Sequence, residues 1–320
     1  MEHVLKHDSQ TSIALRALFA PASIALVGAS NDTTKMGGLY FQHLTETFTG
    51  RAFPVSLKGG IVQGAEAFTT LSDLPVVPDV VFVAVPSQAA IEVTRQAADL
   101  GVPFVVVHTA GFAEAGDHGV EAEAALVEYA RERGTRIVGP NSMGTYGGET
   151  SANLLGLPKL TPGSVSFISA SGTLIQMLAT GLNARGMGYR NVVGFENQAD
   201  IHIYEYLQYC ADDDGTRSIV IYMEGIRGET GRQFVDAMQH ASRKKPVFVL
   251  RGATTVAGQR AALCHRGHFD HGGHRDAARC DQPVGAFCRG LWPLRDFDPA
   301  CRPHRTPPCP RGKGSRCLKR

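Results

Sequence analysis

The stretch ASIALVGASNDTTKMGG, residues 22–38, decides the predicted fold. It opens with the apolar run Ile24–Val27, which is typical of a strand buried on both faces, and Gly28 ends that run. Small and polar residues follow, and a helix is predicted from Met36 to about Thr45. Because the free N–H groups of a first helical turn attract anions, a strand, tight turn and helix in this order predict a phosphate-binding site.

The turn after this strand carries only part of the dinucleotide fingerprint G-x-G-x-x-G. Gly28 supplies the first glycine, whereas Ser30 and Thr33 stand at the other two glycine positions. The second predicted strand, 52–57, is followed by Lys58 and not by the acid that would hold a ribose diol. This chemistry favours a ligand with a phosphate near the second strand, such as coenzyme A (CoA), over NAD. A strand–turn–helix without a ligand is the alternative interpretation.

Composition and charge exclude several classes of protein. With 320 residues and 43% hydrophobic content, the chain can hold two domains of ordinary size. Its net charge of +2 is uneven, because residues 266–320 carry 12 Lys/Arg against 5 Asp and the remainder carries 20 Lys/Arg against 25 Asp/Glu. A mildly acidic body argues against a nucleic-acid surface. No apolar run approaches the ~20 residues of a membrane span. The N-terminus lacks an apolar signal-peptide core, so we expect a cytoplasmic protein.

Strands alternate with helices through the first half of the chain. The predicted strands are 24–27, 52–57, 79–85, 104–108 and 137–138, and the predicted helices are 13–19, 36–45, 87–100 with Ser87 as N-cap, and 120–133. This alternation predicts a parallel, doubly wound, Rossmann-like sheet. Ligands of such sheets lie at the carboxyl ends of the strands. The turns at those ends are all small or polar, namely 28–34, 58–60, 86–87, 108–112 and 140–143.

A polar connector, residues 147–163, leads to a second predicted α/β unit. Its predicted strands are 165–168, 191–195, 218–222 and 246–250. Its first predicted helix follows the turn at 169–173 and ends at about Arg185, and the other two cover 201–211 and 232–243. The turn Ser169–Thr173 again consists of small residues. A Gly- and Ala-rich loop, 252–265, follows the last strand.

Eight segments in order resemble the NDP-forming acyl-CoA synthetases, including ADP-forming acetate–CoA ligases, and the α subunit of succinyl-CoA synthetase. They are VGAS (27–30), PVSLKGG (54–60), VVHTAGF (106–112), VGPNSMG (138–144), SFISASGTL (166–174), ENQAD (196–200), YMEGIR (222–227) and the loop that ends at Cys264-His265. The resemblance implies a CoA-binding Rossmann-like domain over 1–150 and a truncated, succinyl-CoA-ligase-like flavodoxin domain over 151–265. It also implies transfer of a phosphoryl group between nucleotide, histidine and carboxylic acid, after which the CoA thiol attacks the acyl phosphate.

The resemblance assigns site residues one by one. The predicted CoA-binding residues are Gly28, Ala29, Ser30, Asn31, Lys58, Pro86, Thr109, Ala110, Gly111, Asn141 and Ser142. Ser171, Gly172 and Thr173 resemble the start of the helix that faces the phosphohistidine. His265 matches the phosphorylated histidine, and Glu224 the glutamate that binds it.

Physical chemistry is compatible with these roles. A histidine phosphorylated on one ring nitrogen needs an acceptor for its other N–H, and a glutamate serves for that. A helix N-terminus supplies donors to the phosphoryl group without ordering a side chain. Without the family resemblance, Glu224 is equally well interpreted as a solvated carboxylate at a strand end, and His265 is interpreted as an ordinary loop histidine.

The chain departs from the family after its histidine. Relatives usually show Ser-His-Thr-Gly-Ala, whereas residues 264–268 here are Cys-His-Arg-Gly-His. The tail 266–320 has no Glu, Ile, Met, Tyr or Asn and holds 10 Arg and 5 of the 7 Cys, so we interpret it as irregular and disordered, as in a frameshifted reading of the gene. A zinc site is disfavoured because its cysteines form no C-x-x-C pair, and no metal ligand is predicted.

The sequence contains no P-loop and no ATP-grasp unit. We therefore expect ATP or ADP and Mg²⁺ to bind only through an ATP-grasp β subunit or a fused domain. Alternatives to this ligase half are a non-catalytic CoA-binding protein or inactive fragment, and a nicotinamide oxidoreductase, which Ser30 and Lys58 disfavour. The carboxylic acid, the choice of ADP or GDP and the oligomer, homo- or hetero-, are left open.

Overall fold

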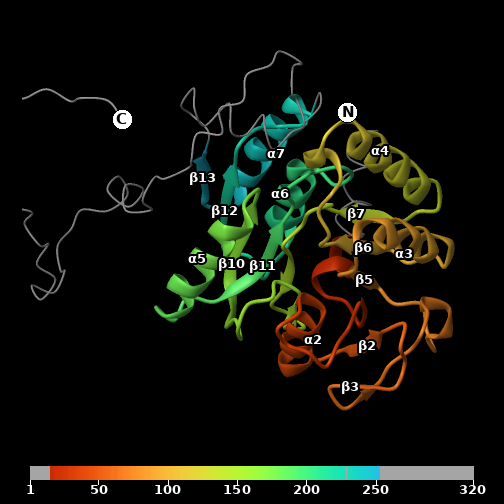
Figure 1. Ribbon diagram of the computed structural model, residues 1–320. Helices are drawn as coiled ribbons and strands as arrows, with labels where there is room; N and C mark the ends of the chain where they lie inside the picture. The colour runs from red at the N-terminus through yellow and green to blue at the C-terminus, as the bar shows by residue number, and fades with distance from the viewer. Residues whose placement is uncertain (1–14, 228–229, 253–320) are drawn as a thin grey trace, which may run out of the picture. The chain divides into compact units, whose positions relative to one another are not determined.

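The computed structural model describes residues 15–227 and 230–252, all of which fall within one compact unit (Figure 1). Residues 15–19 are helical and precede a first sheet of five parallel strands. In spatial order these strands are β2 (Arg51–Val55), β1 (Ser23–Val27), β5 (Val80–Val83), β6 (Phe104–Val107) and β7 (Arg136–Val138). The order reverses between β1 and β5, so the ligand crevice of this sheet is expected at the carboxyl ends of those two strands.

Helices cover both faces of the first sheet. The helix α2 (Met36–Thr47) packs with Leu26 and Phe82 on one face, whereas α3 (Ser87–Asp99) and α4 (Asp117–Glu132) pack with Val81 and Val83 on the other. Side chains alternate between faces along a strand, which explains why neighbouring valines and leucines join different clusters. Shorter elements complete this half: β3 (Ile61–Val62), β4 (Ala65–Glu66), and the 3₁₀ turns η1 (Leu71–Asp73) and η2 (Ala113–Ala115).

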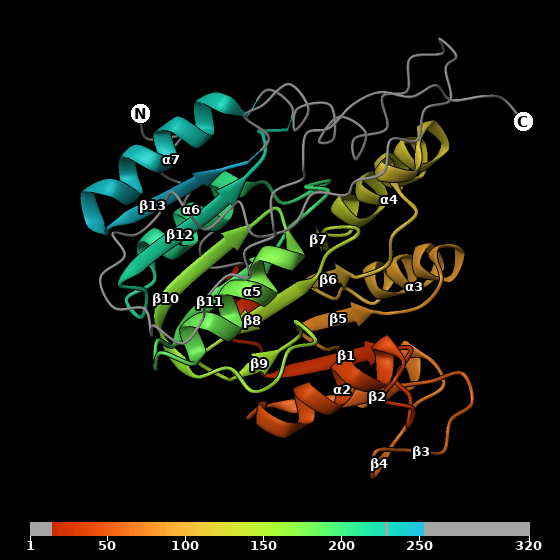
Figure 2. The same cartoon turned by 60° about the vertical axis from the view of Figure 1, so that its left-hand side comes forward.

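The second sheet has six strands, in the order β13 (Val247–Arg251), β12 (Ser218–Met223), β10 (Pro162–Ser169), β11 (Tyr189–Gly194), β8 (Gly144–Gly147) and β9 (Ala152–Asn153). The first four are mutually parallel, and β8 and β9 add an antiparallel hairpin to the edge. Helix α5 (Gly172–Asn183) packs on one face, and α6 (Ile203–Asp212) and α7 (Gly231–Lys244) pack on the other (Figure 2). This arrangement is flavodoxin-like and confirms the predicted α/β fold class.

One apolar cluster joins the two sheets. It contains Leu26 and Phe82 of the first sheet together with Val193 and Ile221 of the second, all of them buried. The hydrophobic effect therefore stabilises both sheets against a common interior.

A buried carboxylate, Asp200, also links the two halves. Its oxygens accept hydrogen bonds from Arg131 Nε at 2.5 Å, from Arg136 Nε at 3.0 Å and from the N–H of Ile137 at 2.7 Å. The same Arg136 forms an ion pair with Glu205 of α6 at 3.1 Å. Helix α4 and strand β7 are thus held to the loop that follows β11.

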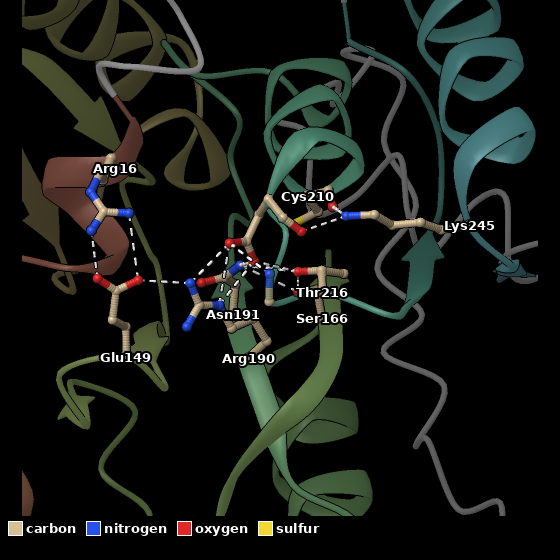
Figure 3. A network of polar contacts seen from close by, with 10 residues as sticks. Arg16, Glu149, Ser166, Arg190, Asn191, Cys210, Thr216 and Lys245 are labelled. Atoms are coloured by element: carbon tan, nitrogen blue, oxygen red, sulfur yellow. Dashed lines mark hydrogen bonds and ion pairs between the residues drawn. The ribbon is translucent and has the colours of Figure 1, made fainter.

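A second polar network joins the helical segment 15–19 to the second sheet (Figure 3). Glu149 accepts hydrogen bonds from Arg16 at 2.5 Å and from Arg190 at 2.7 Å, and Arg190 continues to Asp213 at 2.9 Å. Burial raises the pKa of Asp213, but the hydrogen bonds from Arg190 and Thr216 outweigh it and lower that pKa to about 2. Asp213, the C-cap residue of α6, therefore stays ionised at neutral pH.

The predicted strands and helices are present, with ends that shift by a few residues. Helix α3 begins at Ser87 with Pro86 as N-cap, so the prediction of Ser87 as N-cap was wrong by one position. The sequence did not predict the hairpins β3–β4 and β8–β9, the second of which lies at and inside the predicted polar connector. Among the described residues, no helix is long and apolar enough to cross a membrane.

Candidate functional site

A cavity of about 720 Å³ opens where strands of both sheets end. Eight predicted site residues line it: Thr109, Ala110, Asn141, Ser142, Ser171, Gly172, Thr173 and Glu224. They follow β6, β7, β10 and β12, so strands of both sheets end at this cavity. The remaining lining residues are Met36, Tyr40, His108, Ala113, Met143, Ala170, Gln176, Glu196, Asn197, Gln198, Gly225 and Arg227.

Another group of predicted residues lies at the crevice of the first sheet and does not line the cavity: Gly28, Ala29, Ser30, Asn31, Lys58, Pro86 and Gly111. Gly28 has φ of +96°, and a Cβ there would lie 2.4 Å from the carbonyl oxygen of Ala84. No other residue fits at this close approach between the ends of β1 and β5.

Glycine also packs the helix that follows the turn. A Cβ on Gly37 would lie 1.9 Å from the carbonyl oxygen of Gly28, so α2 can approach the turn only with glycine there. The dinucleotide fingerprint has its third glycine at position 33, whereas the glycine that allows close packing here is Gly37, one residue after the predicted helix start at Met36. The first turn of α2 carries no acidic residue, which suits an anion.

Two groups near this turn fit a phosphorylated ligand to different degrees. Lys58 is exposed and has no ion pair within the described ranges, so its ammonium group is available to a phosphate of CoA. The side chain of Asn31 is already engaged, because Nδ2 donates to Ile61 O at 2.8 Å and Oδ1 accepts from Gln63 N at 2.6 Å. Asn31 therefore fixes the β3–β4 hairpin beside the turn.

We expect Asn31→Ala to loosen the β3–β4 hairpin. Two hydrogen bonds are lost, worth about 1 kcal/mol each, so the local opening free energy should fall by about 1–2 kcal/mol. Hydrogen exchange of the Gln63 amide should then accelerate about 5- to 30-fold. Asn31→Asp keeps the acceptor oxygen and should accelerate it less. Unchanged exchange in Asn31→Ala would contradict this role.

The turn after β7 is fixed by hydrogen bonds. Asn141 adopts φ of +58°, and its N–H donates to Thr109 O at 3.0 Å. The hydroxyl of Ser142, 1% exposed, donates to Gly194 O and accepts from the N–H of Gly144. Ser142 thus ties the two sheets together at the floor of the cavity.

His108 was not predicted as a site residue, although the sequence placed it in a polar turn at a strand end. Its Nδ1 lies 2.8 Å from the carbonyl oxygen of Ser142, which can only accept, so Nδ1 carries the proton and Nε2 is an acceptor. Burial lowers the pKa of His108, against the opposing effect of this hydrogen bond. The neutral imidazole is therefore the form present at pH 7.

Helix α5 presents its N-terminus to the cavity. Ser171 is the N-cap and its Oγ accepts from the N–H of Leu174 at 3.4 Å. The N–H groups of Gly172 and Thr173, at the first two helical positions, have no partner within the helix by its geometry. They are available to an anion in the cavity.

The loop after β12 brings opposite charges to the same cavity. Glu224 is half-buried and accepts a hydrogen bond from the Tyr222 hydroxyl at 3.2 Å. Arg227 forms an ion pair with Glu123 at 2.8 Å and donates to the carbonyl oxygen of Asn197. His265, the predicted partner of Glu224, lies outside the described residues, as does the tail 266–320.

Glu196 is a second site residue that the sequence did not reveal. It follows β11, lines the cavity and receives a hydrogen bond from Met143 N at 3.2 Å. Burial raises its pKa to about 8, although hydrogen bonds from the N–H of Met143 and from its own backbone oppose the rise. The segment ENQAD (196–200) resembles the family, but no role was predicted for Glu196.

Comparison with known proteins agrees with this architecture. A CoA binding domain matches residues 22–148, and a succinyl-CoA ligase like flavodoxin domain matches residues 162–273. The chain is 33% identical over 249 residues to the α subunit of an ADP-forming acetate–CoA ligase II of Pyrococcus furiosus, which covers 78% of this chain and 54% of that subunit. It is 32% identical over 256 residues to the ADP-forming acetate–CoA ligase II of Archaeoglobus fulgidus, which covers 78% of this chain and 37% of that enzyme.

A solved structure shares the fold at similar identity. It is the dinucleotide forming acetyl-coenzyme A synthetase 1 of Ca. Korarchaeum cryptofilum in complex with phosphate and ADP, with a TM-score of 0.75 and 35% identity over 80% of this chain and 55% of that one. Fold and matches together define a protein of the CoA-binding, succinyl-CoA-ligase-like class. Over its matched residues, the chain belongs to the NDP-forming acyl-CoA synthetase family. It spans about half the length of the P. furiosus subunit.

Proposed function

We propose that this chain is the CoA-binding and phosphohistidine-bearing part of an NDP-forming acyl-CoA synthetase. In this reaction a carboxylic acid is converted to an acyl phosphate, and the CoA thiol displaces the phosphate to give the acyl-CoA. Nucleotide and Mg²⁺ bind to an ATP-grasp β subunit or fused domain, and the protein acts in the cytoplasm.

The observation that carries the proposal is the cavity shared by the two sheets. Thr109 and Ala110, which are predicted to bind CoA, line it together with Gly172 and Thr173 of the α5 N-terminus. An acyl phosphate in this cavity would lie within reach of both groups, and transfer then depends mainly on positioning and charge stabilisation.

The residues present fit CoA. Three features suit its phosphates at the crevice of the first sheet. They are the close backbone approach at Gly28, the first turn of α2 with no acidic residue, and the exposed ammonium group of Lys58. Thr109 and Ala110 follow β6 in the same sheet and lead from there to the cavity. CoA supplies the thiol nucleophile, and the chain's own groups orient it and exclude water.

Phosphorylation of the histidine is tested with labelled ATP. We expect the full chain, incubated with its ATP-grasp subunit and γ-labelled ATP, to acquire an acid-labile, base-stable label. His265→Ala should lower the label at least 100-fold, because no other group takes its place. The exposed His118→Ala is the matched control and should be labelled normally.

Calorimetry with CoA and with NAD completes this test. CoA binding together with label on His265 supports the synthetase. CoA binding without label, in the presence of an active ATP-grasp subunit, would indicate a non-catalytic CoA-binding protein or an inactive fragment. Tighter binding of NAD than of CoA would indicate an oxidoreductase.

A further inference from the structure

The carboxyl group of Glu196 is held in an unusual position. The residue follows β11 with φ of +24°, a conformation that side-chain-bearing residues seldom adopt. Oε2 accepts a hydrogen bond from Met143 N at 3.2 Å. Oε1 is shielded from solvent and has no hydrogen-bond partner in the part of the chain that the structure describes, although the residue as a whole is half-buried.

This unpartnered oxygen lies beside the first residue of α5. A Cβ built on Gly172 would stand 3.3 Å from Oε1, and one built on Gly194 would stand 2.9 Å from it. An anion bound by the N–H groups of Gly172 and Thr173 would therefore lie next to Oε1. An ionised carboxylate would repel that anion, whereas a protonated carboxyl would donate a hydrogen bond to it.

We propose that Glu196 is a positioning residue that, in its protonated form, donates a hydrogen bond from Oε1 to the anion held at the N-terminus of α5. The inference rests on the proposed function, which places the phosphoryl group at this helix. Anion binding then takes up a proton wherever Glu196 is ionised beforehand, and the anion becomes a partner for an oxygen that has none among the described residues.

The titratable neighbours of Glu196 are compatible with this role. Tyr40 of α2 and Tyr206 of α6 have pKa values raised by burial, and burial lowers the pKa of His108, so all three are neutral between pH 7 and 9. Glu224 and Arg227 face the cavity from the loop after β12, and Arg227 is paired with Glu123. Burial raises the pKa of Glu196 itself to about 8.

Sulfate is the probe for this proposal, because it remains a dianion throughout the range in which Glu196 titrates. Its binding to the full chain is followed at pH 7 and pH 9 through the amide resonances of Gly172 and Thr173. If the anion binds only when Glu196 is protonated, the affinity for sulfate should fall about tenfold from pH 7 to pH 9. Glu196→Gln donates from an amide at both pH values and should bind with less than twofold change. The exposed Glu128→Gln is the matched control and should fall tenfold like the wild type.

A measurement on the wild type alone keeps the test independent of any variant. Calorimetry in two buffers of different ionisation enthalpy should report uptake of about 0.9 proton per sulfate at pH 9 and about 0.1 at pH 7. If sulfate shifts Gly172 and Thr173 equally at both pH values and takes up no proton, the role of Glu196 is overturned while the anion site remains. If sulfate shifts neither resonance, both the role and the anion site are overturned.

Discussion

Asp200→Ala is expected to lower the free energy of unfolding by about 3 kcal/mol. The carboxyl group is 0% exposed and compensates the charges of Arg131 and Arg136. Removing it leaves the half-buried Arg136 partly uncompensated and leaves the N–H of Ile137 without its acceptor. The melting temperature should fall by about 6–12 °C.

An exposed ion pair provides the control for this substitution. Asp236 pairs with Arg232 on the surface of α7, with both side chains at least half exposed. Because exposed pairs contribute little, Asp236→Ala should change the unfolding free energy by less than about 0.5 kcal/mol. Urea denaturation of both variants measures the difference. A cost below about 1 kcal/mol for Asp200→Ala would show that Asp200 does not hold the two halves together.

Glu196→Gln is expected to stabilise the protein at alkaline pH. Burial raises the pKa of Glu196 from the ordinary glutamate value of 4.5 to about 8 in the folded chain, so the folded state holds this proton more tightly than the unfolded state. Its stabilising effect is complete below pH 4.5 and is lost as the pH rises through 8. Above pH 8 the wild type should therefore be less stable than the Gln variant, by on the order of 3–5 kcal/mol.

The pH dependence separates this effect from an ordinary packing change. Urea denaturation of the wild type and the variant at pH 5, 7 and 9 should show a difference that grows with pH, whereas a packing change would be constant. The same replacement at the exposed Glu128 should give no trend. A constant difference would mean that Glu196 is ionised in the folded chain at all three pH values.

The buried strands were predictable because their information is local. Continuous apolar runs such as Val80–Val83 and Phe104–Val107 are buried on both faces of a parallel sheet, and their composition reflects it. The hairpins β3–β4 and β8–β9 were not predicted. Their strands have only two to four residues each, and contacts with distant segments, such as the bonds from Asn31 to the first hairpin, hold them in place.

The candidate site was predictable in part. Strand ends in a doubly wound sheet converge, so Thr109, Asn141 and Gly172 could be expected near one another, and they line one cavity. The role of Glu196 in the site could not be predicted from the sequence. A glutamate in a polar turn is normally solvated. The packing of α5 and β11 around Glu196 leaves its Oε1 shielded and, among the residues that the structure describes, without a hydrogen-bond partner. His265 stays a prediction, because it lies outside the described residues.

The apolar cluster shared by both sheets limits how the two halves of the chain can be exchanged during evolution. Leu26 and Val193 belong to the same interior although they come from different halves of the chain. Exchanging either half for its counterpart from a distant relative would bring together side chains that were selected for other neighbours, with costs typical of cavities and overpacking. The two halves therefore cannot recombine freely as interchangeable modules, and substitutions at their junction should be retained or lost in pairs.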